Sequence, residues 1–156
     1  MKAETRLFGE IDIEDEKIIR LPGGMIGFPH LQSFALIFNE EKKEKAKWGK
    51  GIMWLQSMDE PQVAFPVMHP NELKPDYNPT VNDEMLKPLG DLTDENIYIL
   101  VTVTATKDIK DTSINLKAPI IINSENRRGC QLIVEDDYPV KYKICEALEK
   151  SEKAGE

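Results

Sequence analysis

Residues 97–104 constrain the fold more than any other part of the chain, because their side chains repeat with a period of two. Isoleucine and valine occupy the odd-numbered positions, and tyrosine, leucine and threonine occupy the even-numbered ones. In a β-strand successive side chains point to opposite faces of the sheet, whereas a helix would need a period near 3.6. The stretch therefore predicts a strand, and its β-branched and aromatic residues favour the same structure.

Shorter stretches of the same character recur along the chain, separated by turn-forming residues. We expect further strands at residues 7–13, 18–21, 33–38, 52–56, 62–68, 114–123 and 131–134. Pro66 has no amide hydrogen to donate, which predicts an edge or a bulge for strand 62–68. Short strands joined by turns predict a mainly β protein, either a closed or nearly closed antiparallel barrel or a sandwich.

Helix signals are confined to two short stretches. Asn82 can cap a helix that runs to about Lys87, because Pro88 then stops it. Apolar residues also recur at four-residue steps within 140–148, after a proline that suits the first turn of a helix. We therefore expect a short C-terminal helix there.

A chain of 156 residues suits one domain. We assign residues 1–149 to this domain and residues 150–156 to a flexible C-terminal tail, and we expect the charge-rich residues 40–50 to form a mobile loop. The N-terminus is not followed by the apolar stretch of a signal peptide, and no apolar run reaches the roughly 20 residues that cross a bilayer. A cytoplasmic protein, monomeric by default, is expected.

The charge balance restricts the classes of partner. The chain carries 28 acidic and 20 basic residues, for a formal net charge of −8. Nucleic-acid affinity depends largely on Lys and Arg that displace counterions from phosphates, so direct nucleic-acid binding is disfavoured. An acidic surface instead attracts basic proteins, although solubility alone would also account for it.

Residues suited to catalysis or metal binding are few and scattered. The two cysteines, Cys130 and Cys145, form no CxxC pair, and the two histidines, His30 and His69, stand outside any recognised catalytic motif. The glycines within 23–27 lead into a Phe-Pro turn rather than a helix, which does not fit a phosphate-binding loop. We expect no catalytic residue, no metal and no cofactor.

Two asparagines bracket an apolar run. Asn115 and Asn123 flank residues 116–122, although asparagine is poor in strands and its amide needs hydrogen bonds when it is buried. One interpretation is that both asparagines pin a loop or a bulge. The other is that Pro119 prevents a neighbouring strand from pairing and leaves an edge for a partner protein.

Eight short motifs follow one another along the chain: Phe8-Gly9-Glu10, LPGGMIGFP at 21–29, WLQS at 54–57, AFPV at 64–67, Pro75-Asp76-Tyr77, TSINLKAPIIIN at 112–123, Gly129-Cys130-Gln131 and Tyr138-Pro139-Val140. In this order they resemble the FliW family of flagellar assembly factors. Each motif is short, but together they extend from about residue 5 to residue 148. The chain departs from the family pattern where residues 40–50 lengthen a connection and in its charged end after residue 148.

The resemblance implies a fold, a function and two partners. The family fold is a small antiparallel β-barrel, in agreement with the period of two. Family members bind flagellin in the cytoplasm and also bind CsrA, a small RNA-binding repressor of translation. When flagellin is exported, the released factor captures CsrA and relieves repression of flagellin synthesis. The chain is therefore expected to be a non-catalytic partner-switching regulator.

The expected flagellin contact is apolar, because a few aromatic and aliphatic side chains supply most interface energy. The aromatic candidates also suit the core. Among the polar candidates we expect charge reversal at Lys117 to weaken one partner with little loss of stability. The candidate partner-binding residues are Phe28, Phe65, Tyr77, Asn115, Lys117 and Asn123.

Two other functions stay open from the residues alone. The first is a β-barrel enzyme or small-ligand-binding protein with an unrecognised pocket. The second is an acidic, nucleic-acid-associated barrel. Co-purification with flagellin or CsrA separates both from the regulator.

Overall fold

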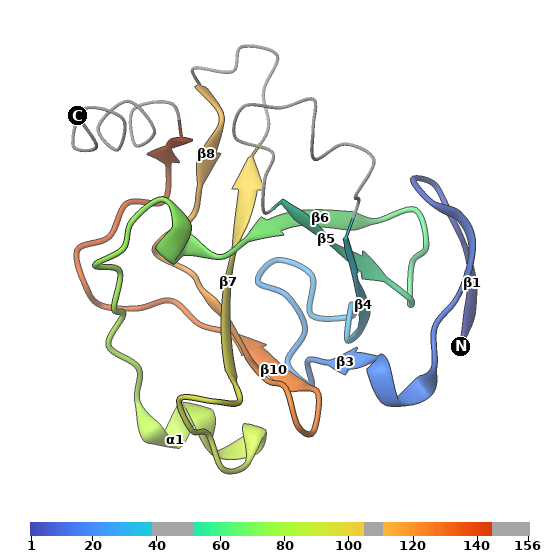
Figure 1. Cartoon of the computed structure of the whole chain (residues 1–156), viewed down its shortest axis with the longest axis horizontal. Coiled ribbons are helices and arrows are strands. Elements are labelled where there is room, and N and C mark those ends of the chain that lie inside the picture. The colour runs from blue at the N-terminus through green and yellow to red at the C-terminus, as the bar shows by residue number, and fades with distance from the viewer. Residues whose placement is uncertain (39–51, 105–110, 145–156) are drawn as a thin grey trace.

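The structure, a computed structural model, describes residues 1–38, 52–104 and 111–144 (Figure 1). Its centre is a closed barrel of seven strands: β3 Ile19–Arg20, β4 Ser33–Phe38, β5 Met53–Ser57, β6 Ala64–Met68, β7 Ile97–Thr104, β9 Ile120–Asn123 and β10 Arg128–Gln131. They hydrogen-bond in the order β7-β6-β5-β4-β3-β10-β9, and β9 pairs with β7 to close the ring. The pairings are antiparallel except for one parallel contact between β10 and β3. The prediction of a small antiparallel barrel is confirmed.

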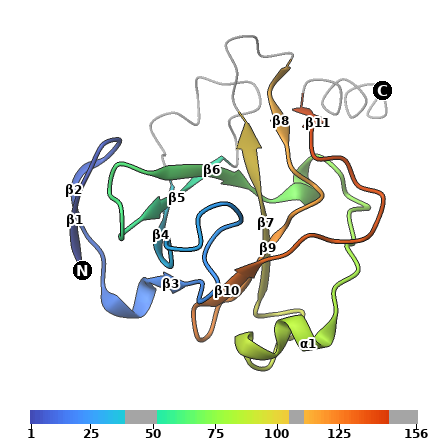
Figure 2. The ribbon, with the colours of Figure 1, turned by 180° about the vertical axis from the view of Figure 1, so that it is seen from behind.

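Shorter elements surround the barrel (Figures 1 and 2). β1 (Lys2–Thr5) and β2 (Gly9–Asp12) form a separate hairpin, while β8 (Ser113–Ile114) and β11 (Tyr142–Lys143) extend the far end of β7. The helical segments are η1 Asp15–Lys17, η3 Pro70–Glu72, α1 Asp83–Leu86 and η4 Lys87–Leu89. None of the helices in the described ranges has the length and apolar character to cross a membrane.

Strand β7 closes the barrel because it pairs with three neighbouring strands along its length. It pairs with β9 through residues 97–100, with β6 through Val101 and Thr102, and with β8 through Val103 and Thr104. Its predicted bounds are confirmed at both ends. A strand that touches this many partners needs apolar or β-branched side chains on both faces, and this sequence supplies them.

The core divides into two apolar clusters. The larger one fills the barrel, and the smaller one lies where β7 passes β8 and the segment before α1. Burial of each such large side chain stabilises the fold by roughly 1.5–3 kcal/mol. The larger cluster contains Ile19, Leu21, Met25, Leu31, Phe34, Met53, Leu55, Val67, Leu100, Ile120 and Ile122. The smaller cluster contains Met68, Tyr77, Val101, Val103, Ile114, Leu116 and Ile144.

Three predicted strands differ from the structure. Residues 7–13 are not one strand, because the chain reverses before β2 with Gly9 at a φ of +66°. Residues 114–123 are broken into β8 and β9, since the Asn115 side chain accepts hydrogen bonds from the amides of Lys117 and Ala118 and holds a turn. The last strand, predicted at residues 131–134, instead begins three residues earlier in the structure, as β10 (Arg128–Gln131).

The helix predictions met different outcomes. Asn82 caps α1 as predicted, because its side chain accepts a hydrogen bond of 2.9 Å from the amide of Glu84. The predicted helix at 140–148 is wrong at its beginning, where Tyr142 and Lys143 pair with β8 as β11. Ile144 is helical as predicted, and the rest of that helix lies outside the described residues, as do the predicted loop 40–50 and tail 150–156.

Candidate functional site

A tight turn between β3 and β4 brings apolar side chains to the surface. Met25 and Phe28 exchange backbone hydrogen bonds of 3.2 and 2.7 Å, so residues 25–28 close on themselves. Met25 is buried beneath the turn, whereas Ile26 is 46% exposed and Phe28 41% exposed. Two large apolar side chains are therefore exposed within one four-residue turn.

Glycine is required just before this turn. Gly24 has a φ of +71°, a region that side chains with a Cβ rarely adopt. A Cβ at this position would lie 2.5 Å from the carbonyl oxygen of Pro29, closer than atoms can pack. The local sequence therefore fixes the direction in which the 25–28 turn leaves the barrel.

The turn borders a groove of about 260 Å³ that runs along β6 and β7. Among the described residues, β6 pairs with β7 through Val67 and Met68 alone, and residues 64–66 have no strand partner on that side within the part of the chain that the structure describes. Pro66 lacks the amide needed to extend that ladder, which agrees with the edge predicted from the sequence. The residues that line this groove, called the turn groove below, are Met25, Ile26, Phe65, Pro66, Thr102, Val103, Thr104, Asn115, Ala118 and Gln131.

Two sets of contacts hold the turn against the barrel. Gln131 on β10 accepts a hydrogen bond of 2.8 Å from the amide of Ile26, and its own amide donates to the carbonyl of Ala118. The Phe28 ring meets Phe65 edge-on at a centroid distance of 5.5 Å, and Phe65 in turn lies 6.3 Å from buried Phe34. These contacts connect the exposed turn to the core through aromatic packing.

Three of the six candidate residues come together at the turn groove. Phe65 and Asn115 line it, and Phe28 packs on Phe65 at its rim. Phe28 is exposed and Phe65 is half-buried. Both can therefore contact a partner, and both also contribute to the packing of the barrel.

The other three candidates act in the scaffold. Tyr77 is 4% exposed and its hydroxyl donates a 2.7 Å hydrogen bond to the carbonyl of Leu116. The Lys117 ammonium donates to the carbonyl of Asp136 at 2.6 Å. Asn123 is 2% exposed and holds a loop through its side chain. These contacts favour structural roles.

The two asparagines both pin loops, the first of the two interpretations. Asn123 donates to the carbonyls of Leu89 and Asp91, and Asn115 holds the turn before β9. The alternative of an open edge at Pro119 is wrong, because the carbonyl of Pro119 accepts a 3.0 Å hydrogen bond from the amide of Leu132.

Sequence reasoning missed Ile26 and Gln131. A signal for Ile26 was available, because an isoleucine between Gly24 and Gly27 in a tight turn has little room to point inward. Gln131 left no comparable signal. Its side chain holds the turn by accepting from the amide of Ile26, which is 105 positions away in the sequence, and only the fold brings the two together.

The chemistry of the turn groove suits binding. None of its lining side chains is an acid or a base, so the groove combines apolar surface with amide and hydroxyl groups. Elsewhere, His30 is exposed with its Nε2 3.3 Å from a Glu60 carboxylate oxygen. Burial raises the pKa of the Cys130 thiol, and Cys145 lies outside the described residues. Across the described ranges, no three His, Cys, Asp or Glu side chains are grouped to hold a metal ion.

Comparison with known proteins gives a consistent result. The family model described as FliW protein matches residues 2–144. The chain is 42% identical to the flagellar assembly factor FliW of Lachnospira eligens over 97% of this chain and 99% of that protein. It is 38% identical to the factor of the same name from Lachnoclostridium phytofermentans, over 98% and 96% of the two chains. A crystal structure of the flagellar assembly factor FliW superposes with a TM-score of 0.82 at 28% identity, covering 92% of this chain and 96% of that one.

Proposed function

Because this chain belongs to the FliW family, whose relatives are named flagellar assembly factors, we propose that it regulates flagellar assembly by binding flagellin and CsrA in alternation. The proposal needs no bond to be made or broken. The protein works in the cytoplasm as a monomer, and its only ligands in this role are other proteins. Binding of one partner excludes the other.

The turn groove is the observation that supports flagellin binding. Exposed Ile26 and Phe28 flank a groove beside residues 64–66 of β6, which have no strand partner on the β7 side among the described residues. Interface energy concentrates in a few aromatic and aliphatic anchors at the edge of a pocket. An apolar segment of flagellin can lie in the groove, where Asn115 and Gln131 offer polar groups beside it.

Charge supports the second partner. CsrA, as an RNA-binding protein, presents a basic surface, and this chain has a formal net charge of −8. The β1–β2 hairpin and the residues after it concentrate acidic side chains on the exposed surface, with Glu4 directly opposite Glu10 across the ladder. Opposite potentials accelerate encounter and orient the partners. The exposed acidic residues there are Glu4, Glu10, Asp12, Glu14, Asp15 and Glu16.

Mutual exclusion makes the protein a sensor of free flagellin. Two ligands that exclude each other are thermodynamically linked, so abundant flagellin lowers the apparent affinity for CsrA. CsrA then stays free to repress translation. When export removes flagellin, the vacant protein captures CsrA and repression ends.

A competition measurement tests this function. Purified CsrA is immobilised with this protein bound to it, and flagellin is titrated into the flow. We expect flagellin to release the protein from CsrA, with the released fraction set by the two affinities. A stable complex that holds all three proteins without mutual weakening would contradict the proposed exclusion.

A further inference from the structure

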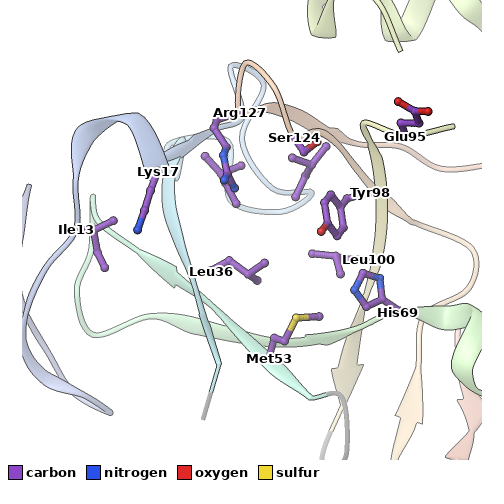
Figure 3. Close-up of a pocket in the computed structure, with 12 residues that line it drawn as sticks. Ile13, Lys17, Leu36, Met53, His69, Glu95, Tyr98, Leu100, Ser124 and Arg127 are labelled. Atoms are coloured by element: carbon purple, nitrogen blue, oxygen red, sulfur yellow. The ribbon is translucent and has the colours of Figure 1, made fainter. Parts of the chain in front are cut away.

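A second cavity, of about 780 Å³, opens at one end of the barrel (Figure 3). Side chains of the larger core cluster, including Leu100 and Met53, back it, and half-buried Leu36 lines it. Its volume falls within the range of small-molecule sites, which lie preferentially in places such as the mouths of β-barrels. It shares no lining residue with the turn groove.

Two cations reach into this cavity. Lys17 comes from η1 and Arg127 from the turn between β9 and β10, and Figure 3 shows both side chains directed from the rim toward the space above Leu36. Within the described ranges, neither side chain forms an ion pair or a hydrogen bond. One carboxylate, Glu95, lines the opposite part of the rim. Two cations against one carboxylate give the lining of the cavity a positive charge balance.

Arg127 ends the turn between β9 and β10 in the left-handed region of the backbone, and its amide donates a 2.8 Å hydrogen bond to the carbonyl of Asn123. Its φ is +59°, and among the described residues it is the only one other than glycine with a positive φ. Glycine or asparagine adopts this conformation more readily, and a longer side chain here has an energetic cost. Strained positions of this kind concentrate at ligand clamps. A glycine would adopt this backbone conformation more easily but would place no side chain in the cavity, as Arg127 does.

The opposite wall is aromatic. Tyr98 on β7 is 44% exposed, and its ring lies 5.6 Å from that of His69, tilted by 32°. Both rings line the cavity and face the cationic side across it (Figure 3). A planar or aliphatic body can pack on these rings and on Leu36 while its charged group meets the cations.

We propose that this cavity binds a small amphiphilic anion, in which one carboxylate, sulfonate or phosphate group is joined to an apolar or aromatic body. Lys17 and Arg127 hold the anionic group, and Tyr98, His69 and Leu36 contact the body. The site is additional to the binding of flagellin and CsrA. Its test uses neither protein, so the two proposals succeed or fail separately.

The test uses two fluorescent probes that differ only in charge. 8-Anilinonaphthalene-1-sulfonate carries a sulfonate on an aromatic body, and N-phenyl-1-naphthylamine is the same body without it. Titrated into the full chain, the sulfonate is expected to bind. Arg127→Gln and Lys17→Gln should each weaken it about tenfold, which corresponds to the loss of one charge-assisted hydrogen bond. Binding of the uncharged probe should change less than about twofold, because it does not contact these cations.

Matched variants separate this site from general charge and from misfolding. Arg128 is adjacent in sequence and exposed but does not line the cavity, so Arg128→Gln should leave the sulfonate affinity unchanged. Arg127→Gly relieves the strained φ, so it should weaken the sulfonate while the melting temperature stays the same or rises. The proposal is overturned if the sulfonate fails to bind, if neither cavity cation matters, or if Arg128→Gln weakens it as much as Arg127→Gln.

Discussion

At the scale of single residues, side-chain amides determine where strands end. Asn123 is buried at the end of β9 and makes three hydrogen bonds, donating to Leu89 and Asp91 and accepting from the amide of Glu125. A buried polar group left without its partners costs more than the bond itself contributed. Asn123 therefore belongs to the barrel's framework.

Asn123→Ala should lower the free energy of unfolding by about 2–3 kcal/mol, because it removes three side-chain hydrogen bonds, one of them fully buried. Asn126 also donates to the Leu89 carbonyl but is exposed, so Asn126→Ala is the matched control and should cost about 1 kcal/mol or less. Urea unfolding measures both. Equal losses in the two variants would show that burial of Asn123 is not the cause.

Lys117 gives two expectations that one variant separates. From the sequence, charge reversal weakens a partner and leaves stability unchanged. From its hydrogen bond to the Asp136 carbonyl, Lys117→Glu should destabilise by about 1 kcal/mol or more, a fall of roughly 2–4 °C in melting temperature. Lys141→Glu, at an exposed lysine, is the control and should change little. A thermal scan that finds Lys117→Glu as stable as the control would restore Lys117 as a partner-contact candidate.

At the scale of elements, the connection from η3 to α1 is held to the barrel by Tyr77. Its ring packs edge-on against Tyr138 at 4.6 Å, and its hydroxyl donates to the carbonyl just after β8. Burial raises the pKa of Tyr77 well above its usual range, because a phenolate there would lose its solvation. In the unfolded chain the phenol ionises near pH 10. The stabilising contribution is therefore complete below about pH 10 and is lost as the pH rises further.

Tyr77→Phe should accordingly flatten the loss of stability in alkaline solution, while it costs about 1 kcal/mol at neutral pH through the missing hydrogen bond. Tyr98→Phe, at an exposed tyrosine, is the control and should keep the alkaline profile of the unmodified protein. Urea midpoints between pH 8 and about 11.5 measure the profiles. The explanation fails if Tyr77→Phe loses stability with pH as steeply as the control.

How much of these elements the sequence predicts depends on where the information lies. The alternation in 97–104 and the cap at Asn82 are local signals, and both predictions are confirmed. The break in 114–123 was missed because the alternation continues through it, and only the Asn115 side chain interrupts the strand. Strand β11 was missed for a different reason. Its four-residue apolar spacing suits a helix, but pairing with β8 across the fold overrides that preference.

The candidate site was partly predictable on the same grounds. Aromatic residues beside turn-forming prolines singled out Phe28 and Phe65, which meet at the turn groove. Tyr77 also lies near turn-forming prolines, but it is buried. Sequence patterns do not show which side of a turn faces the core, so its burial could not be predicted. The cavity with Lys17 and Arg127 joins residues 110 positions apart and has no sequence signature.

At the scale of the whole molecule, net charge should control the association rate of CsrA with this protein. Steered association slows as salt screens the two surfaces, so the association rate should fall by about tenfold between low and physiological salt. Glu10→Lys should slow it at low salt. The same change replaces a repulsive cross-strand pair with Glu4 by an attractive one, so stability should rise by a few tenths of a kcal/mol. Stopped-flow association rates that do not change with ionic strength would contradict electrostatic steering.

The most direct test of the whole account is the affinity of flagellin for two aspartate variants. Ile26→Asp places a charge at the turn groove, and Met85→Asp places one at an equally exposed position on α1 (46% and 50%). Titration calorimetry should show flagellin binding weakened by about tenfold or more in Ile26→Asp and unchanged in Met85→Asp, with both variants as stable as the unmodified protein. Flagellin binding to Ile26→Asp as tight as to Met85→Asp would contradict the turn groove as its site.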